Sequence, residues 1–409
     1  MYIKKIELDN VKCFEHLEME FENYPGWHVI LGENGVGKTT ILKAISASLF
    51  SDTTSFSVEE DFTNWIRHNK EFAKIVIGFD EINKPSILTF DDDDGIGRNL
   101  GLMAQEQKEL LETYYNPNKD NSFHAAFGSF RRIGNKNLIS NNKKLNKAIA
   151  HITLFDTSYT FVGALEWLKT QKLKEFEGDK TSKKILESIF HLFNNTNLLP
   201  DKVKLNKVSS DGVEFIDSFG NPMSIYDMSD GYQSVLSMMM ELVRLMTLHF
   251  DIDELFNKLI DENFAFDVKG IVLIDEVDIH LHPTWQVQIG NWFKRYFPKI
   301  QFIVTTHSPL ICQSAKGGSI WKLAGKGAEK PIEKIEGDDF NRLVYGNILN
   351  AMGTGIFGKN VMRSEDAKEK KERLAELNTY KAFGKITAEE EKELQELRKL
   401  FATDDKYSF

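Results

Sequence analysis

The first 50 residues combine a strand-like alternation with a helical repeat. Apolar and charged residues alternate from Leu17 to Phe21, and residues 2–31 as a whole predict half-buried strands, most simply antiparallel ones. The short apolar run that closes this region ends at Gly32 and is typical of a buried strand. From Lys38 to Phe50 the apolar positions take helical spacing, so a helix follows the glycine.

Two continuous apolar runs in the second half of the chain predict buried parallel strands. They cover residues 271–274 and 301–304, and a helical pattern at 284–296 separates them. Strand, helix and strand in this order form a βαβ unit, whose sheet is covered on both faces. A further apolar helix is predicted at 234–250.

The rest of the chain shows weaker patterns. Within residues 51–225 they predict one strand, two helices and one hairpin, at 72–79, 105–115, 182–199 and 203–216. From Ser364 the chain is strongly charged, and two short helices around Gly384 resemble a helical hairpin, with a solvated tail as the alternative. We therefore expect an amino-terminal lobe, an insertion or lid, a carboxy-terminal lobe and a charged extension, at residues 1–50, 51–225, 226–325 and 326–409.

The composition is that of a globular protein. Of the 409 residues, 27% are charged and 41% are hydrophobic, which excludes wholesale disorder. The net charge of −10 argues against a bulk nucleic-acid coater but leaves room for a local basic patch. Cys13 and Cys312 indicate neither a disulfide framework nor a zinc site, so we expect reduced core residues. Without a membrane-length apolar run or a signal-peptide pattern, a cytoplasmic protein without membrane contact is expected.

Residues 32–39 match the phosphate-binding pattern GxxxxGK[ST]. The pattern follows a predicted strand and opens a predicted helix, the context in which main-chain N–H groups and the helix N-terminus face phosphate oxygens. A glycine-rich turn without function is the disfavoured alternative. Lys38 would reach the β- and γ-phosphates, and the Thr39 hydroxyl would bind Mg²⁺. The residues expected around the nucleotide are Asn34, Gly35, Val36, Gly37, Lys38, Thr39 and Thr40.

Two carboxylates and one histidine follow the predicted parallel strands. Asp275 and Glu276 come directly after the run at 271–274, at the strand end where open parallel sheets bind ligands. Asp275 can hold Mg²⁺ through water, and Glu276 is placed to act as a general base. His307 follows the next strand and can donate to a γ-phosphate, although a lone histidine is often structural.

Ser229 and Gly231 open the apolar helix at 234–250. Ser229 is a good helix N-cap, which is the simpler interpretation. The alternative is a second anion site formed by the serine, the glycine backbone and the helix dipole. Because one phosphate tail does not need two such sites from one subunit, this alternative implies a second subunit.

Taken in order, these four motifs resemble the Walker A, signature, Walker B and switch-histidine motifs of the ABC ATPase superfamily. Residues 228–232 are similar to the family's LSGGQ signature and depart from it at Asp230 and Tyr232. The stretches 3–14 and 275–283 look like the RecF/SMC branch rather than a transporter subunit.

Three further stretches resemble a group of stand-alone bacterial AAA/ABC ATPases, which includes ATPase subunits of anti-phage systems such as Septu and some retrons. They are residues 127–132, 318–323 and 342–358. The resemblance implies an α/β fold, namely an ABC ATPase head. Such a head has a P-loop parallel sheet core and an amino-terminal antiparallel β-subdomain. A helical insertion or lid and a carboxy-terminal helical hairpin would complete this chain.

The resemblance further implies ATP and Mg²⁺ as cofactors and a homodimer or higher oligomer with composite ATP sites. The residues that would act within one chain are Lys38, Thr39, Asp275, Glu276 and His307, and those that would act across the interface are Ser229 and Gly231. Glu276, His307 and Lys38 would be catalytic, and Thr39 and Asp275 would bind the metal. Arg131 and Arg132 are either a surface basic pair or residues with a role near phosphate or in sensing.

The leading hypothesis is an ATP-hydrolysing switch whose nucleotide-driven dimerisation regulates a separate effector, a nuclease, in anti-phage defence. One alternative is a RecF-like ATPase that binds nucleic acid directly in DNA repair or recombination. Another is a scaffold that binds ATP without useful turnover. Residues 334–339 superficially resemble the start of a Toprim nuclease, but the later paired aspartates of that domain do not follow. We therefore expect no nuclease in this chain.

Overall fold

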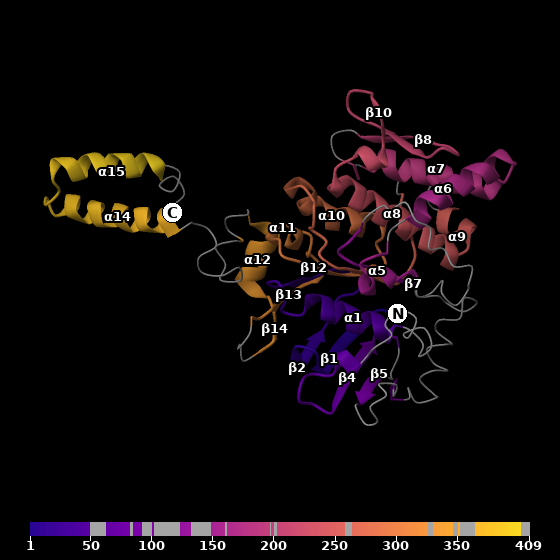
Figure 1. The fold of residues 1–409 in the computed structure, drawn as a ribbon, viewed down its shortest axis with the longest axis horizontal. Coiled ribbons are helices and arrows are strands. Elements are labelled where there is room, and N and C mark those ends of the chain that lie inside the picture. The colour runs from indigo at the N-terminus through magenta and orange to yellow at the C-terminus, as the bar shows by residue number, and fades with distance from the viewer. Residues whose placement is uncertain are drawn as a thin grey trace. The chain divides into compact units, whose positions relative to one another are not determined.

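The fold is known from a computed structural model that divides into two compact units, residues 1–348 and 349–409. It describes residues 1–49, 63–81, 85–91, 100–101, 123–131, 149–159, 162–196, 198–199, 203–257, 264–325, 330–346, 351 and 365–401. The first unit contains two larger sheets, a small sheet and most of the helices (Figure 1). Among the described helices, none combines the length and hydropathy that a bilayer crossing requires.

An antiparallel sheet forms the amino-terminal part of this unit. Its strand order is β2-β1-β4-β5-β6, and its strands are β1 (Ile3–Val11), β2 (Phe14–Glu20), β4 (Phe72–Phe79), β5 (Ser86–Asp91) and β6 (Leu100–Gly101). In the middle of β1 and β2 buried side chains recur at every second residue, at Ile6 and Leu8 and at Leu17 and Met19. The period of two in the sequence therefore gave the correct faces, because one face of this sheet packs on the core.

The central sheet has the strand order β14-β13-β3-β12-β11-β7. Its strands are β3 (Gly26–Leu31), β7 (Phe123–Phe127), β11 (Gly270–Ile274), β12 (Ile300–Thr306), β13 (Ser319–Leu323) and β14 (Ile332–Lys334). Only the β13–β14 pair is antiparallel. All residues of β11 and β12 are buried, and α10 (Pro283–Tyr296) connects them, so the predicted βαβ unit is present.

Helix α1 (Lys38–Ser48) lies between the two large sheets (Figure 1). Its buried residues Ile41, Leu42 and Ile45 join one hydrophobic core with side chains of β1 and β4 on one side and of β11 and β12 on the other. On the opposite face of the central sheet, α10 packs through stacked rings of Phe293 and Trp27, whose centroids lie 5.7 Å apart. The strand ends that precede the P-loop and Asp275 are thus held by packing on both faces.

The remaining helices and the small sheet lie along the same unit. They are η1 (Thr63–Trp65), α5 (Ile152–Phe155), α6 (Val162–Phe176), α7 (Lys180–Asn195), η2 (Ile225–Asp227), α8 (Asp230–His249), α9 (Ile252–Asn257), α11 (Pro309–Cys312) and α12 (Gly337–Tyr345), with strands β8 (Lys204–Val208), β9 (Val213–Ile216) and β10 (Pro222–Ser224). The predicted hairpin at 203–216 is formed by β8 and β9, and the helix predicted at 182–199 is α7. The helix predicted at 105–115 lies outside the described residues.

Residues 51–225 contribute strands to both large sheets. Strands β4 and β5 extend the antiparallel sheet, and β7 is the edge strand of the central sheet beside β11. The segment that the sequence suggested as an insertion or lid therefore also supplies part of the head itself. Cys312 is buried as expected, but Cys13 is exposed, because it lies in the turn between β1 and β2 rather than under a sheet.

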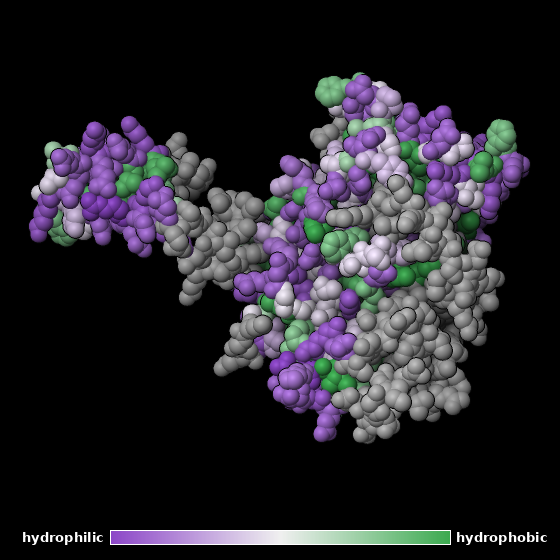
Figure 2. Space-filling view, viewed as in Figure 1, coloured by the Kyte–Doolittle hydropathy of each residue, from purple (hydrophilic) through white to green (hydrophobic). Residues whose placement is uncertain are grey.

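The second unit holds a helical hairpin of α14 (Glu365–Ala382) and α15 (Ala388–Leu400). Leu377, Leu394 and Leu397 form its small apolar core, and Thr387 and Glu390 form a capping box that starts α15. The surface of the hairpin is largely hydrophilic in Figure 2. The helices predicted around Gly384 are therefore present, and they pack on each other rather than forming two solvated segments.

Candidate functional site

The P-loop joins the end of β3 to the start of α1 and depends on two left-handed glycines. Gly35 has φ 78° and Gly37, the N-cap of α1, has φ 106°. A Cβ on Gly37 would lie 2.5 Å from both Cys13 Sγ and Phe14 Cζ, so the β1–β2 turn packs directly against this glycine. Both backbone conformation and space require glycine at position 37.

Lys38 is buried, and its ammonium group connects the loop to His307. Its Nζ donates to the main-chain carbonyls of Gly32 (2.9 Å) and Glu33 (3.0 Å) and lies 2.8 Å from His307 Nε2. Because an ammonium group can only donate, Nε2 accepts this bond and the imidazole is neutral. Burial lowers the pKa of His307, and the Lys38 charge lowers it further. Burial also lowers the pKa of Lys38.

Asp275 accepts hydrogen bonds from two threonines, one in the first turn of α1 and one near the end of β12. Thr39 Oγ1 donates to Oδ2 at 2.8 Å, and Thr305 Oγ1 donates to Oδ1 at 2.6 Å. Asp275 is 3% exposed, so these hydrogen bonds replace contacts with water that its carboxylate loses on burial. A hydroxyl and a carboxylate oxygen side by side are donors of the kind that Mg²⁺ prefers, so Thr39 and Asp275 fit the predicted metal site.

Glu276 lies in a strained turn directly after β11. Its φ is 45°, and its N–H donates to Thr305 Oγ1 at 2.7 Å. Its Oε1 lies 3.9 Å from His307 Nε2, and its side chain is 30% exposed, so water can reach the carboxylate. The predicted residues Lys38, Asp275 and His307 therefore meet Glu276 at one edge of the central sheet, although 269 residues separate Lys38 from His307.

The signature residues form a different part of the surface. Ser229 is the N-cap of α8 but makes no side-chain cap hydrogen bond, and it is exposed. Gly231 packs against the turn after Asp275, because a Cβ there would lie 2.4 Å from the His280 carbonyl oxygen. Among the described contacts, Ser229 is in none of those that join Lys38, Asp275 and His307.

Arg131 is a buried member of the site, so the surface-pair interpretation is wrong for this residue. It follows β7, is 4% exposed, and donates to the main-chain oxygens of Asp275 (2.9 Å) and Glu276 (2.7 Å). The sequence marked the stretch 127–132 only through its family resemblance, and no side-chain pattern could indicate carbonyl partners so distant in the chain. Arg132 lies outside the described residues.

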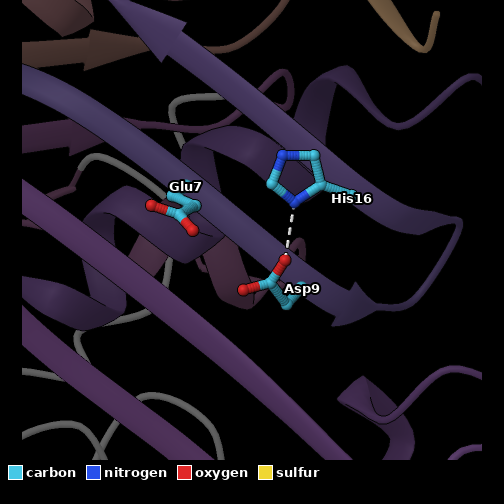
Figure 3. A group of neighbouring side chains, drawn as sticks. All are labelled: Glu7, Asp9 and His16. Atoms are coloured by element: carbon cyan, nitrogen blue, oxygen red, sulfur yellow. Dashed lines mark hydrogen bonds and ion pairs between the residues drawn. The ribbon is translucent and has the colours of Figure 1, made fainter.

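A separate group of potential metal ligands lies on β1 and β2. The ligand atoms of Glu7, Asp9 and His16 all lie within 4.8 Å of one another (Figure 3). His16 Nδ1 is 2.6 Å from Asp9 Oδ1, and Lys5 Nζ lies 3.5 Å from the Glu7 carboxylate. Cross-strand pairing and these ion pairs account for the grouping, so we assign no metal to it.

The chain has the fold of an SMC ATPase head, as the sequence resemblance implied, and in it the P-loop meets the turn that begins at Asp275. A solved Smc head bound to the C-terminal winged-helix domain of ScpA superposes with a TM-score of 0.50 at 17% identity, over 82% of this chain and 98% of that one. This likeness establishes the fold.

The chain belongs to the family described as "AAA domain, putative AbiEii toxin, Type IV TA system", whose profile matches residues 28–313. It is 28% identical to the Septu protein PtuA of Bacillus mycoides, over 78% of this chain and 40% of that protein. It is 26% identical to the retron Ec83 probable ATPase of Escherichia coli, over 78% of this chain and 71% of that protein. The chain thus spans less than half of the first relative and most of the second.

Proposed function

We propose that the protein binds ATP with Mg²⁺ and hydrolyses it at sites shared between two copies of the chain, and that this cycle regulates a separate effector in anti-phage defence. The observation that carries the proposal is the meeting of Lys38, Asp275, Glu276 and His307 beside the P-loop. Lys38 and the N-terminus of α1 would hold the phosphates, and Thr39 and Asp275 would hold the metal.

The side chains support a direct hydrolysis step. A water molecule would attack the γ-phosphorus, the bond from that phosphorus to the bridging oxygen would break, and ADP would leave. Glu276 would accept the proton of the water, and His307 would contact the γ-phosphate. Bound Mg²⁺ would neutralise charge on the phosphates. The turn that holds Glu276 is anchored by Thr305, so the carboxylate is positioned before the nucleotide arrives.

The exposed signature turn supports a second copy as partner. Ser229 and the main chain of Gly231 stand at the start of the 20-residue helix α8, where the helix dipole favours an anion. A second chain would therefore present its bound γ-phosphate to this turn, and the two copies would form a homodimer or part of a larger assembly. The names of the Septu and retron relatives support an anti-phage role, and we propose a nuclease as the regulated effector.

The variant Glu276→Gln tests the proposal, because it keeps the size of the side chain but removes the base. We expect hydrolysis to fall by about 10²- to 10⁴-fold, with ATP still bound and dimers stabilised. Phosphate release and light scattering after gel filtration measure the two effects. Glu187→Gln, which changes an exposed carboxylate on α7, is the matched control. Unchanged hydrolysis in Glu276→Gln would remove this residue from its role, and ATP-dependent binding of duplex DNA at low salt would support the RecF-like alternative instead.

A further inference from the structure

Arg131 uses four of its five N–H donors on three parts of the head. Its Nη1 donates to the carbonyls of Gly128 (3.3 Å) and Asp275 (2.9 Å), and its Nη2 donates to the carbonyl of Glu276 (2.7 Å). Its Nε donates to Ser234 Oγ at 3.0 Å. The planar guanidinium therefore joins the loop after β7, the turn after β11 and the first turns of α8.

The turn after β11 and the start of α8 are also in direct contact. Gly231 approaches the carbonyl of His280, and the rings of Tyr232 and Trp285 lie 5.3 Å apart. Two residues of the signature itself, Gly231 and Tyr232, are thus packed on the segment that follows Glu276. Arg131 is the part of this contact that reaches the main chain of Glu276 itself.

The charges around Arg131 explain why a cation can be buried here. The neighbouring carboxylates of Asp275, Asp278 and Glu276 favour the charged form. Burial lowers the pKa of Arg131 to about 10, so the guanidinium remains protonated at neutral pH. A lysine would keep the charge but could not reach Ser234 and both carbonyls at once, because its donors radiate from one nitrogen.

We propose that Arg131 is a positioning residue that fixes the main chain of Glu276 and couples it to the signature helix of the same chain. When a second copy presents its nucleotide to Ser229 and Gly231, the resulting restraint on α8 is passed through Ser234 and Arg131 to Glu276. Occupation of one composite site therefore sets the geometry of the other. This inference rests on the proposed ATPase function.

Three variants of the full chain test the coupling. Arg131→Lys replaces the planar guanidinium, which donates to several groups at once, by a single ammonium group. Ser234→Ala removes only the hydrogen bond between Arg131 and helix α8. Arg244→Lys is the matched control, because Arg244 is an arginine of α8, with 14% of its side chain exposed, that pairs with Glu241 at 2.6 and 2.8 Å. Each variant is measured for binding of a fluorescent ATP analogue, for kcat and Hill coefficient of phosphate release, and for thermal unfolding.

We expect Arg131→Lys and Arg244→Lys to unfold at similarly reduced temperatures, while only Arg131→Lys loses at least about 10-fold in kcat. Its analogue affinity should stay within about 3-fold of wild type. Ser234→Ala should keep most of kcat but lower the Hill coefficient toward 1, an effect that a merely structural role would not produce. Equal kcat and Hill coefficients in Arg131→Lys, Ser234→Ala and Arg244→Lys would overturn the inference.

A second measurement does not need turnover or a folded Arg131 variant. In the Glu276→Gln background, Ser234→Ala should weaken ATP-dependent dimerisation by about 3- to 10-fold, and Arg244→Lys should not. Dimerisation unaffected by Ser234→Ala would also overturn the inference. Failure of the proposed function looks different, because then the wild-type chain itself would neither bind the analogue nor form ATP-dependent dimers.

Discussion

The two halves of the proposed ATP site differ in how far one chain completes them. Around the P-loop, Lys38, Thr39 and Asp275 are buried or half-buried; Lys38 is bonded to His307 and to the main chain, and Thr39 is bonded to Asp275. At the signature, Ser229 is exposed and makes no cap hydrogen bond. The comparison indicates that one chain preorganises the groups for chemistry, whereas the groups that would recognise a second nucleotide depend on assembly.

Substitutions in the P-loop half and in the signature half of the proposed ATP site should both abolish activity, the first through loss of ATP binding and the second through loss of dimerisation. We expect Lys38→Ala to lose ATP binding by at least about 100-fold, because a charged hydrogen-bond donor to the phosphates is removed. Ser229→Arg should leave the affinity of the single chain for ATP near wild type but prevent dimerisation of this variant with itself, because a bulky cation then enters both halves of the interface. Equilibrium binding and light scattering separate the two defects.

Mixing these two inactive variants gives the sharpest outcome. A heterodimer has one intact composite site, with the P-loop of the Ser229→Arg chain and the signature turn of the Lys38→Ala chain. An equal mixture should therefore regain part of the wild-type activity, at most about half of it when every dimer is mixed, since a mixed dimer carries one intact site of two. A mixture as inactive as its components would show that the two halves do not come from different chains.

Substitutions of Gly37 and Gly35 distinguish the cost of a steric clash from the cost of backbone strain within the P-loop. Both have positive φ, but only at Gly37 would a Cβ meet neighbouring atoms, whereas nothing lies within 4 Å of one at Gly35. We expect Gly37→Ala to lower the free energy of unfolding by about 3 kcal/mol and Gly35→Ala by about 1 kcal/mol. Urea unfolding measures both, and equal losses would contradict the role given to the β1–β2 turn.

Two buried histidines should make the head less stable in acid. The expected loss of stability per pH unit is smaller than the loss expected for Gly37→Ala. Burial lowers the pKa of His28 and of His151 to about 3, so both stay neutral in the folded head while the unfolded chain binds protons below about pH 6.5. Stability contributed by each is therefore complete above pH 6.5 and falls by roughly 1.4 kcal/mol per pH unit between pH 6.5 and about 3.

Urea unfolding between pH 8 and pH 5 measures this dependence. His151 accepts or donates bonds to Ser46 and His124, at 2.7 and 2.6 Å, so His151→Gln retains polar partners while removing the titration. We expect this variant to have a flatter pH dependence than the wild type. An unchanged slope would mean that carboxylates alone cause the loss of stability.

Local patterns predicted the elements around the P-loop and Asp275, and long-range contacts explain what they missed. The P-loop, the strand before Asp275 and helix α10 are each specified by residues close in sequence, and the structure brings them together as a parallel sheet requires. The placement of β4 and β7 in two different sheets could not be read from residues 51–225, because their partner strands lie far along the chain. Arg131 was ambiguous because three of its four partners are main-chain carbonyl groups, which every residue carries.

The signature turn has a consequence for how its sequence can vary. Asp230 is exposed, so a change of side chain there meets solvent, whereas any side chain at Gly231 meets the carbonyl of His280. The ring of Tyr232 packs against the ring of Trp285, so the two residues would have to change together. Position 230 can thus accept other side chains, position 231 cannot, and position 232 can change only together with residue 285. This explains how the chain can differ from the usual signature on both sides of the glycine and still keep the glycine itself.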